Sequence, residues 1–453
     1  EVLGLRFALR HGDTPTNERT RQTRRPPHLL VTTPETFQLM FTGHRLRAML
    51  SSVQAVIIDE VHDLAGSERG WQLRLGLQRL EALCGRTLQK VGLSATVGNP
   101  EQVASWISNG SCQPILAPAE RSTVLTVETA PPLAEDEVGA MEMRLSPRAH
   151  ATFRLMSEIV ENDPPCLVFV NSRNAAETVA QRLQTMAPKL TIGVHHGSLA
   201  AETRQEMEEN IRNGTLQALI CTSSLELGID VGSIRKIVQL ESPRSVDRML
   251  QRVGRADHRI GGIGRGHLLA WETDGIAESA VIAHRSHLGS IEDVEWRNRP
   301  YSIAANQIML MAHSFKVVRI DDVHEIFERT EQFADWTRKD TENTLAVLAD
   351  RWLLRYSLDP NETPWYRWPK HLYLAAKDAI PDADSWPDEL PRYDVADEDI
   401  PVEYKSMRMP VPKQFKDGWF ASAGRTRRWV EHHLSMIPDK QSYRVRDAVT
   451  RRS

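Results

Sequence analysis

Two adjacent acidic residues, Asp59 and Glu60, have the type and position needed for phosphate chemistry. They directly follow an apolar run, residues 53–58, which the pattern predicts to be a short buried strand of a parallel sheet. Open α/β sheets bind ligands at the carboxyl ends of their strands. Because an unpaired carboxylate is costly to bury, the pair fits a site that holds Mg²⁺ and activates water in a nucleoside triphosphatase. A loop that happens to begin with Asp-Glu is the competing interpretation of this stretch alone.

The composition limits the classes of protein to consider. The chain has 453 residues, enough for about three domains. Its net charge is -4 and its pI about 6.5, so any contact with nucleic acid must be local. No run reaches the length of a membrane span and there is no signal peptide, so we expect a cytoplasmic protein. Four cysteines lie far apart without a CxxC or Cys/His cluster, which argues against a zinc site or a disulfide framework and suggests small core residues: Cys84, Cys112, Cys166 and Cys221.

Short apolar runs alternate with helical patterns twice along the chain, which predicts two α/β domains with parallel sheets. We expect the first over residues 1–117 and the second over 118–275. A helical region, 276–377, follows. Its three predicted helices and a possible β-wing, formed by residues 352–357 and 366–376, describe a winged-helix domain. Residues 378–453 are predicted to form an acidic loop and the start of a further domain.

Four short motifs occur in order and together carry a resemblance. They are DEVH (59–62), SAT (94–96), TSSLELGIDVG (222–232) and QRVGRADHR (251–259). They resemble motifs II, III, V and VI of superfamily-two helicases. Three further sequence segments resemble the large helicase-related (Lhr) family: RHGDTPTNER (10–19), TTPE (32–35) and HLSMIPDKQSYRVRDAV (433–449). The resemblance covers essentially the whole chain and implies an α/β fold: two tandem RecA-like parallel-sheet lobes, the first incomplete, then the winged-helix domain and the start of a further domain.

The resemblance assigns roles to the first two motifs. Asp59 is expected to hold Mg²⁺ through water, and Glu60 to orient and deprotonate the water that attacks ATP. His62 is expected to hydrogen-bond toward Ser94 and Thr96 and so couple hydrolysis to domain movement. The competing interpretations are a histidine that only supports a helix start and two hydroxyls that cap the following helix.

Motifs V and VI supply the other half of the expected ATP site. Arg255 is the candidate arginine finger. The remaining candidates for ATP binding are Gln251, Gly228, Asp230 and Arg259. This chain departs from the common QxxGRxGR pattern, because His258 replaces the second arginine and Asp257 replaces a glycine. Whether Arg259 takes the place of the missing arginine stays open.

The expected track for nucleic acid uses hydroxyls, backbone amides and arginine, which contact the backbone of a single strand. By resemblance, the residues are Gly12, Asp13, Thr33, Pro34 and Glu35 in the first lobe and Asn171, Ser172, Arg173, His196, Gly197 and Thr222 in the second. Each also fits an ordinary cap or turn. The Arg-rich stretch 19–25 is either a phosphate patch or a solvated loop. Trp336 and Trp352 either stack on bases or lie in a core.

One expected element is absent from the sequence. A P-loop requires G-x-x-x-x-G-K-[ST], and the chain contains no Gly-Lys dipeptide. Because the chain begins with Glu1 rather than Met, we expect a piece of a longer helicase that is truncated at both ends. Without a P-loop, this chain is expected to bind ATP poorly and not to hydrolyse it.

The sequence therefore predicts an ATP- and Mg²⁺-dependent helicase or translocase. It is expected to act 3′ to 5′ on single-stranded or forked DNA, with a role in DNA repair. The alternatives are a nucleic-acid-binding or partner-binding module without ATPase activity, and a helicase that acts on RNA or an RNA–DNA hybrid.

Overall fold

The computed structural model describes residues 4–95, 97–116, 122–226, 234–256, 263–296, 298–356, 367–368, 409–410 and 418–433. The chain divides into two compact units. The first comprises residues 1–93, 101–113 and 295–453, and the second comprises residues 94–100 and 114–294. No helix in the described part of the chain combines the length and the apolar character needed to cross a lipid bilayer.

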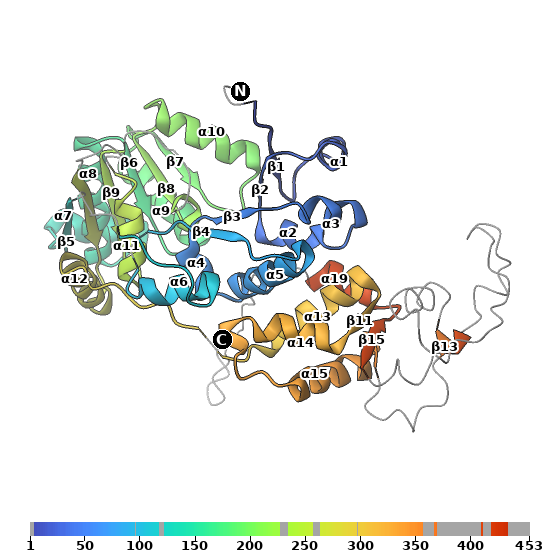
Figure 1. Cartoon of the computed structure of the whole chain (residues 1–453). Helices are drawn as coiled ribbons and strands as arrows, with labels where there is room; N and C mark the ends of the chain where they lie inside the picture. Colours follow the sequence, from blue (N-terminus) through green and yellow to red (C-terminus); the bar gives the residue numbers. More distant parts are fainter. Residues whose placement is uncertain are drawn as a thin grey trace. The chain divides into compact units, whose positions relative to one another are not determined.

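The first unit begins with an α/β segment (Figure 1). Its strands form two parallel pairs, β1 with β2 and β3 with β4. The strands are β1 (Phe7–Arg10), β2 (Leu29–Thr32), β3 (Ala55–Ile58) and β4 (Gln89–Gly92). The helices are α1 (Thr16–Arg24), α2 (Pro34–Met40), α3 (His44–Leu50), α4 (Val61–Ala65), α5 (Glu68–Cys84) and α6 (Pro100–Ser108).

One face of these strands is open and apolar. Phe7 and Leu29 are cross-strand neighbours with exposed fractions of 73% and 54%, and Leu9 and Val31 form the next exposed pair. Ile57 on β3 is 61% exposed. Parallel sheets normally bury both faces, but each of these two strand pairs has exposed apolar side chains on one face among the described residues.

The prediction of a buried strand over residues 53–58 is therefore wrong in its burial. The strand exists as β3, but of its four residues only Ile58 is buried. Successive side chains of a strand point to opposite faces. Ile58 consequently lies on the covered face, and its neighbour Ile57 lies on the open one.

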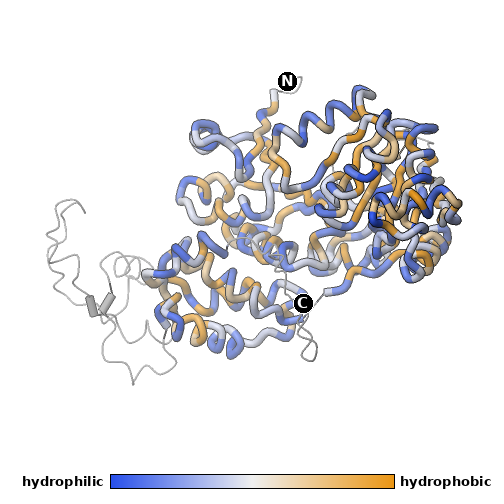
Figure 2. Tube along the Cα trace, turned by 180° about the vertical axis from the view of Figure 1, so that it is seen from behind, coloured by the Kyte–Doolittle hydropathy of each residue, from blue (hydrophilic) through white to orange (hydrophobic). Residues whose placement is uncertain are grey.

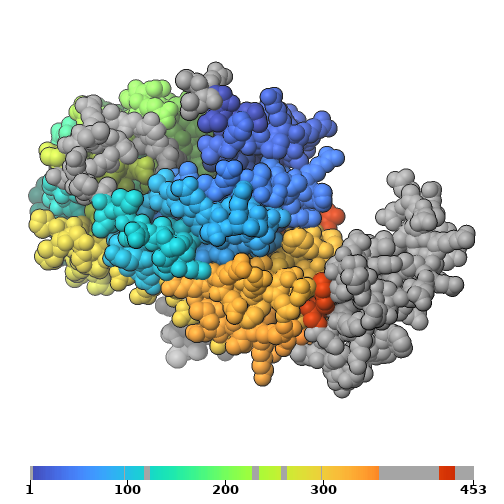
Figure 3. Space-filling model, viewed as in Figure 1, coloured from blue at the N-terminus to red at the C-terminus, as the bar shows by residue number. Residues whose placement is uncertain are grey.

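The first unit also contains the helical region (Figure 3, orange, with residues 418–433 in red). Its helices are α13 (Tyr301–Phe315), α14 (Ile320–Glu328), α15 (Arg338–Asp350) and α19 (Thr426–His433), with a short 3₁₀ turn at Glu331–Phe333. The strands β11 (Val317–Arg319), β15 (Trp419–Ser422) and β12 (Leu354–Arg355) form an antiparallel sheet in that order. Four helices and a small antiparallel sheet make up the described part of this region, and the expected winged-helix domain stays a prediction.

A single hydrophobic core joins α5 to this helical region. Trp71 and Leu75 of α5 pack with Ile308, Phe327 and Trp336. Trp336 is 2% exposed and is a core residue, whereas Trp352 is 75% exposed. The early α/β segment and the helical region, which the sequence places in separate domains, thus share one core.

The predicted pairing of the β-wing is wrong for the residues that the structure describes. Leu354 and Arg355 of β12 pair with Ser422 and Ala421 of β15, and not with Arg367 and Trp368, the two described residues of the predicted second wing strand. Arg367 and Trp368, which form β13, pair instead with β14 (Met409–Pro410). The partner of β12 comes from about 65 residues further along the chain, a separation that local sequence patterns do not encode.

The second unit contains a six-stranded sheet with the order β5-β10-β9-β6-β8-β7, and every neighbouring pair is parallel. The strands are β5 (Ser122–Glu128), β6 (Cys166–Phe169), β7 (Ile192–His195), β8 (Ala218–Cys221), β9 (Lys236–Leu240) and β10 (Ile263–Leu269). The helices are α7 (Ala134–Met143), α8 (Pro147–Asn162), α9 (Arg173–Met186), α10 (Ala201–Arg212), α11 (Val246–Val253) and α12 (Thr273–His287), with a 3₁₀ turn at Ser223–Leu225.

The centre of this sheet is apolar on both faces. All residues of β6 and β8 are buried, and the strands appear mainly orange in Figure 2. Two separate core clusters, one on each face, confirm the α/β architecture. Cys166 and Cys221 are buried in this sheet as expected, whereas Cys84 and Cys112 are only partly buried.

Candidate nucleotide and nucleic-acid sites

The acid pair lies at the carboxyl end of β3, as the sequence predicts. Asp59 is exposed, and its Oδ1 accepts a hydrogen bond from the Glu60 backbone N–H at 3.0 Å. Glu60 has a φ of 47°, the left-handed conformation, and it precedes α4 directly. This conformation costs a non-glycine residue of order 1 kcal/mol.

His62 lies beside the acid pair. Its side chain is 4% exposed, and its Nδ1 is 3.7 Å from Glu60 Oε2. Its Nε2 is 3.8 Å from Asp63 Oδ1, so the ring lies between two carboxylates of its own loop and helix. These separations place the His62 ring next to the Glu60 carboxylate, at a distance longer than a hydrogen bond. The predicted link from His62 to motif III stays a prediction.

Motif III begins directly after β4. The backbone of Leu93 donates to Ile58 O at 2.8 Å and accepts from Val61 N–H at 2.9 Å, which ties the end of β4 to the loop that carries the acids. Ser94 follows Leu93 in the chain and is exposed. Thr96 lies outside the described residues.

Motif VI lies at the end of α11 in the second unit. Gln251 is on the helix and Arg255 follows its last turn. The Nε of Arg255 donates to the backbone carbonyl of Glu226 at 3.0 Å, so motif V holds the base of the candidate finger. Gly228, Asp230 and Arg259 lie outside the described residues, and their predicted roles stay predictions.

The sequence reasoning missed the buried ion pair that joins motifs V and VI. Arg252 and Glu226 have side chains that are 3% and 9% exposed, and Arg252 Nε donates to Glu226 Oε1 at 2.7 Å. Arg252 also hydrogen-bonds Gln239 and lies over the ring of Phe169 with 5.0 Å between guanidinium carbon and centroid. A signal was present, because a glutamate and an arginine inside two otherwise functional motifs need partners if they are buried. The pair positions the carbonyl that holds Arg255.

The second-lobe candidates for nucleic-acid contact lie together. Asn171 and Ser172 follow β6, His196 and Gly197 follow β7, and Thr222 follows β8. These three strands are neighbours in the order β6-β8-β7, so their carboxyl ends form one edge. The sheet therefore brings these residues to a single surface strip.

Several residues of this strip already bind other groups of the protein. Ser172 accepts from Ala175 N–H at 3.1 Å and caps α9, and Arg173 donates to Ser198 Oγ. Asn171 donates to Ser242 O at 2.9 Å. His196 is buried, and its Nε2 hydrogen-bonds Glu177 at 3.0 Å. Gly197 borders open space, because an added Cβ would meet no atom within 4 Å.

The first-lobe candidates also share one edge, because β1 and β2 are parallel. Gly12 and Asp13 follow β1, while Thr33, Pro34 and Glu35 follow β2. Thr33 accepts from Thr36 N–H at 3.3 Å and caps α2, where Pro34 takes the first position.

Glu35 has a protein partner. Arg69 Nε donates to its Oε1 at 2.5 Å and Arg69 Nη2 to its Oε2 at 3.2 Å. Burial raises the pKa of Glu35, but the hydrogen bond and charge of Arg69, together with hydrogen bonds from a backbone N–H and from Thr33, outweigh burial, and the net shift is downward. Arg69 therefore offsets the negative charge that Glu35 adds to the predicted track.

The Arg-rich stretch forms most of α1 and is not the solvated loop that the sequence allows as an alternative. Arg19 donates to His11 O at 3.0 Å and also to Gly12 O, next to Asp13. An arginine thus supports the backbone of the β1 loop.

The residues present fit a magnesium ion that is held mainly by a nucleotide. Within the described ranges, no group of three or more His, Cys, Asp or Glu residues lies in a metal-binding arrangement. Magnesium typically binds one or two protein carboxylates and fills its remaining positions with water and phosphate oxygens. The exposed carboxylate of Asp59 meets that requirement.

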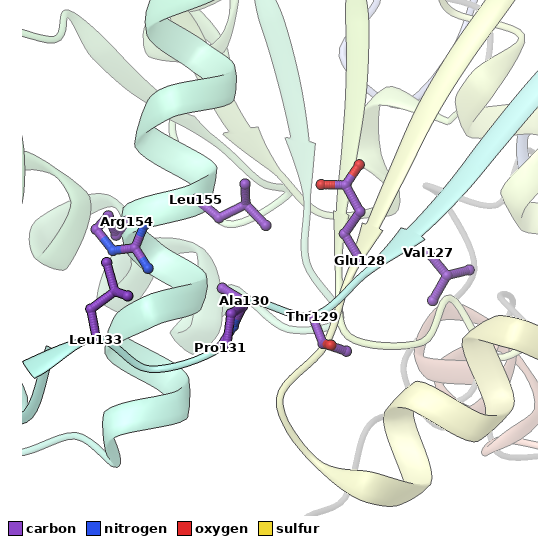
Figure 4. Close-up of a pocket in the computed structure, with 8 residues that line it drawn as sticks. All are labelled: Val127, Glu128, Thr129, Ala130, Pro131, Leu133, Arg154 and Leu155. Atoms are coloured by element: carbon purple, nitrogen blue, oxygen red, sulfur yellow. The ribbon is translucent and has the colours of Figure 1, made fainter.

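A cavity of about 590 Å³ in the second unit has none of the candidate site residues in its lining (Figure 4). Its lining includes Val127, Leu133 and Leu155, with Glu128 and Arg154 on opposite sides of the view. Both charged groups are already paired. Glu128 hydrogen-bonds His267 at 2.8 Å, and Arg154 binds Asp136 at 3.2 Å.

Sequence models of two families match the chain. "DEAD/DEAH box helicase" matches residues 1–103, and "Helicase conserved C-terminal domain" matches residues 151–261. The ATP-dependent helicase Lhr-Core protein 2 of Thermococcus barophilus is 33% identical over 354 residues, which cover 76% of this chain and 40% of that protein. The Lhr helicase/uracil glycosylase of Escherichia coli is 32% identical over 394 residues, which cover 77% of this chain and 25% of that protein.

Solved structures agree with these matches. Mycobacterium smegmatis helicase Lhr bound to ssDNA and AMP-PNP superposes with a TM-score of 0.68 at 34% identity, covering 78% of this chain and 46% of that one. The helicase MrfA bound to DNA, at 20% identity and a TM-score of 0.59, shows the same fold.

The two parallel-sheet segments and the motifs at their strand ends define a superfamily-two helicase with RecA-like lobes. Within that class, the chain belongs to the Lhr family. It spans between a quarter and two fifths of the length of these two curated relatives.

Proposed function

We propose that this protein is the motor part of an ATP-dependent helicase that moves along single-stranded DNA. The observation that carries the proposal is the Asp59–Glu60 pair at the carboxyl end of β3, with His62 3.7 Å from Glu60. A strand end with two acids is where a hydrolase needs a metal ligand and a base.

Each side chain has a distinct role in this proposal. Asp59 holds Mg²⁺, which neutralises charge on the phosphates when it is bound. Glu60 accepts the proton of the attacking water, and His62 keeps the Glu60 carboxylate in position. Arg255 supplies positive charge to the phosphate being transferred, and Gln251, Gly228, Asp230 and Arg259 help to bind ATP. Ser94 and Thr96 connect hydrolysis to movement.

The single strand lies along the two strips of residues at the strand ends. Its phosphates meet helix starts, exposed amides and Arg173, which read the backbone and not the base sequence. The relative from M. smegmatis was solved with ssDNA, which supports DNA as the track. We infer movement from 3′ to 5′ and a place in DNA repair, and forked DNA as a natural substrate.

The first test is ATP hydrolysis with and without single-stranded DNA. It compares this chain with a form extended upstream in its gene to include a P-loop. Hydrolysis that requires the extension supports the proposal, because this sequence contains no G-x-x-x-x-G-K-[ST] motif to hold the phosphates. If neither form hydrolyses ATP while DNA binding persists, the protein is a binding module and the proposal fails.

The substitution Glu60→Gln tests the base in the active form. We expect turnover to fall at least 100-fold while ATP binding is kept, because the amide cannot accept the proton. Glu142→Gln is the matched control, since Glu142 is exposed on α7 of the second unit. Turnover within a few-fold of the parent in Glu60→Gln excludes Glu60 as the base.

Strand displacement on blocks placed 5′ or 3′ of a single-stranded loading region tests direction. Because movement runs from 3′ to 5′, displacement of only the block on the 5′ side is expected. Displacement of only the 3′ block, or equal displacement of both, contradicts the inferred polarity. The same assay with an RNA loading strand separates DNA from RNA as the track.

A further inference from the structure

The first unit contains a polar cavity that the proposed helicase reaction does not use. Its volume is about 690 Å³, within the usual range for small-molecule sites. Its walls come from α5, the turn after α5, the start of β4, the turn after α6 and the last part of α14. Lys90 lines it near the amino end of β4, whereas Asp59 follows the carboxyl end of β3, so the two sites lie at opposite ends of parallel strands.

The cavity carries more positive than negative charge. Its lining residues include four cationic side chains, Arg74, Arg86, Lys90 and Arg329, and two carboxylates, Glu81 and Glu325. The two carboxylates each have a cationic partner. Lys90 Nζ lies 2.6 Å from Glu81 Oε1, and Arg329 hydrogen-bonds Glu325 one helical turn away. The net positive charge therefore resides on Arg74 and Arg86.

Arg74 is a fully buried arginine that has only neutral hydrogen-bond partners. Its Nη2 donates to Asn109 Oδ1 at 2.7 Å and to the Arg329 carbonyl at 3.4 Å. With its amide turned so that the oxygen faces Arg74, Gln78 accepts from the same nitrogen at 2.9 Å. Burial lowers the pKa of Arg74 to about 10, so the side chain keeps its charge at neutral pH.

Two buried polar atoms of the lining have no partner among the residues that the structure describes. They are Arg74 Nε and Ser108 Oγ. A buried donor without a partner costs about 1–3 kcal/mol, so a bound ligand or water is expected to satisfy it. Arg86 adds a second guanidinium, which donates to the carbonyls of Ser52 and Val53 at 3.4 and 2.8 Å.

We propose that this cavity binds a small phosphate-bearing molecule, with Arg74, Arg86 and Ser108 as its ligands. A phosphate monoester carries nearly two negative charges and several acceptor oxygens. It therefore matches two guanidinium groups whose hydrogen-bond partners are neutral, and a hydroxyl without a hydrogen bond. The carboxylates of Glu81 and Glu331 act on Arg74 by charge alone. Guanidinium groups bind phosphate better than ammonium groups do because of their planar, forked donors.

The ligand would act on the junction between the early α/β segment and the helical region. Arg74 belongs to α5 and Arg329 immediately follows α14, and both line the cavity. The same junction contains buried hydrogen bonds from Gln72 to Asn306 at 2.9 Å and from Arg79 to Gln307 at 3.1 Å. A phosphate held between the two helices raises the resistance of the first unit to unfolding.

Isothermal titration calorimetry with inorganic phosphate tests the site on the full chain, at constant ionic strength. We expect saturable binding by the parent chain. Arg86→Gln is expected to weaken it at least tenfold and Ser108→Ala about threefold. Arg45→Gln is the matched control, because Arg45 is an exposed arginine of α3 in the same unit outside this cavity, and its affinity is expected to be unchanged.

Thermal unfolding without phosphate confirms that each variant is folded before its affinity is compared. Absence of binding to the parent at 10 mM phosphate overturns the proposal. So does equal affinity of the parent and Arg86→Gln. A loss of binding in Arg255→Gln with no loss in Arg86→Gln assigns the phosphate to the nucleotide site and also overturns it.

Discussion

The buried pair of Glu226 and Arg252 gives the sharpest test of how motifs V and VI are held together. Both side chains are at least nine-tenths buried and are linked by a hydrogen bond of 2.7 Å. At an effective dielectric constant of about 20, two unit charges about 4 Å apart attract by about 4 kcal/mol. Removing one partner of a buried pair leaves an uncompensated charge and costs about 3–5 kcal/mol.

The perturbation is a double-mutant cycle of Glu226→Gln and Arg252→Met. Met keeps an apolar stem against Phe169, which Arg252 now covers. We expect each single variant to lower the free energy of unfolding by about 3 kcal/mol. The double variant should lose at least 2 kcal/mol less than the sum, because no unpaired charge remains.

Urea denaturation followed by far-ultraviolet circular dichroism measures these differences, with the denaturant slope checked for each variant. Glu278→Gln is the control, because the ion pair of Glu278 with Arg244 is exposed and is expected to contribute less than about 1 kcal/mol. Additive losses from the two single variants, within about 0.5 kcal/mol, refute the reasoning.

Two further predictions concern folding of each unit. Burial raises the pKa of Asp136, but hydrogen bonds from Arg154 and the Leu133 backbone outweigh it and lower the pKa to about 2. A lowered folded-state pKa stabilises the protein above the unfolded value of about 3.9, and the contribution is lost as the pH falls toward 2. Asp136→Asn should therefore cost about 2 kcal/mol in urea denaturation at pH 7 and much less at pH 2.5; an equal cost at both pH values contradicts this. In the first unit, Gly70→Ala should destabilise by about 3 kcal/mol, because its Cβ would lie 1.8 Å from Leu64 O. Gly424→Ala, whose Cβ meets no atom within 4 Å, is the control, and equal unfolding midpoints in these two variants contradict the steric argument.

Local patterns in the sequence predict the elements of the parallel sheets well. The apolar runs that become β6 and β8 are short and bounded by polar residues, so their burial follows from their composition. The candidate residues of the second lobe were chosen by resemblance, and their position at one edge follows because a parallel sheet aligns the ends of its strands. Asn171, His196 and Thr222 thus come together without any knowledge of side-chain contacts.

Other features depend on contacts between distant residues and were missed. The partner of β12 lies at β15, and the core that joins Trp71 to Ile308 combines residues more than 200 positions apart. The pairing of Glu226 with Arg252 also requires the fold to bring two motifs together. The exposure of Ile57 was missed because an apolar residue in a strand is expected to be buried by a neighbouring element. The sequence does not show where that neighbouring element is lacking.

The open apolar face of β1 to β3 determines how this chain will behave in solution. Phe7, Leu9, Leu29, Val31 and Ile57 form exposed apolar surface on strands, a combination that favours self-association and binding of hydrophobic dyes. Light scattering as a function of protein concentration should therefore precede any binding study of this chain. DNA that adheres to an aggregate would otherwise be mistaken for DNA held at the strand ends.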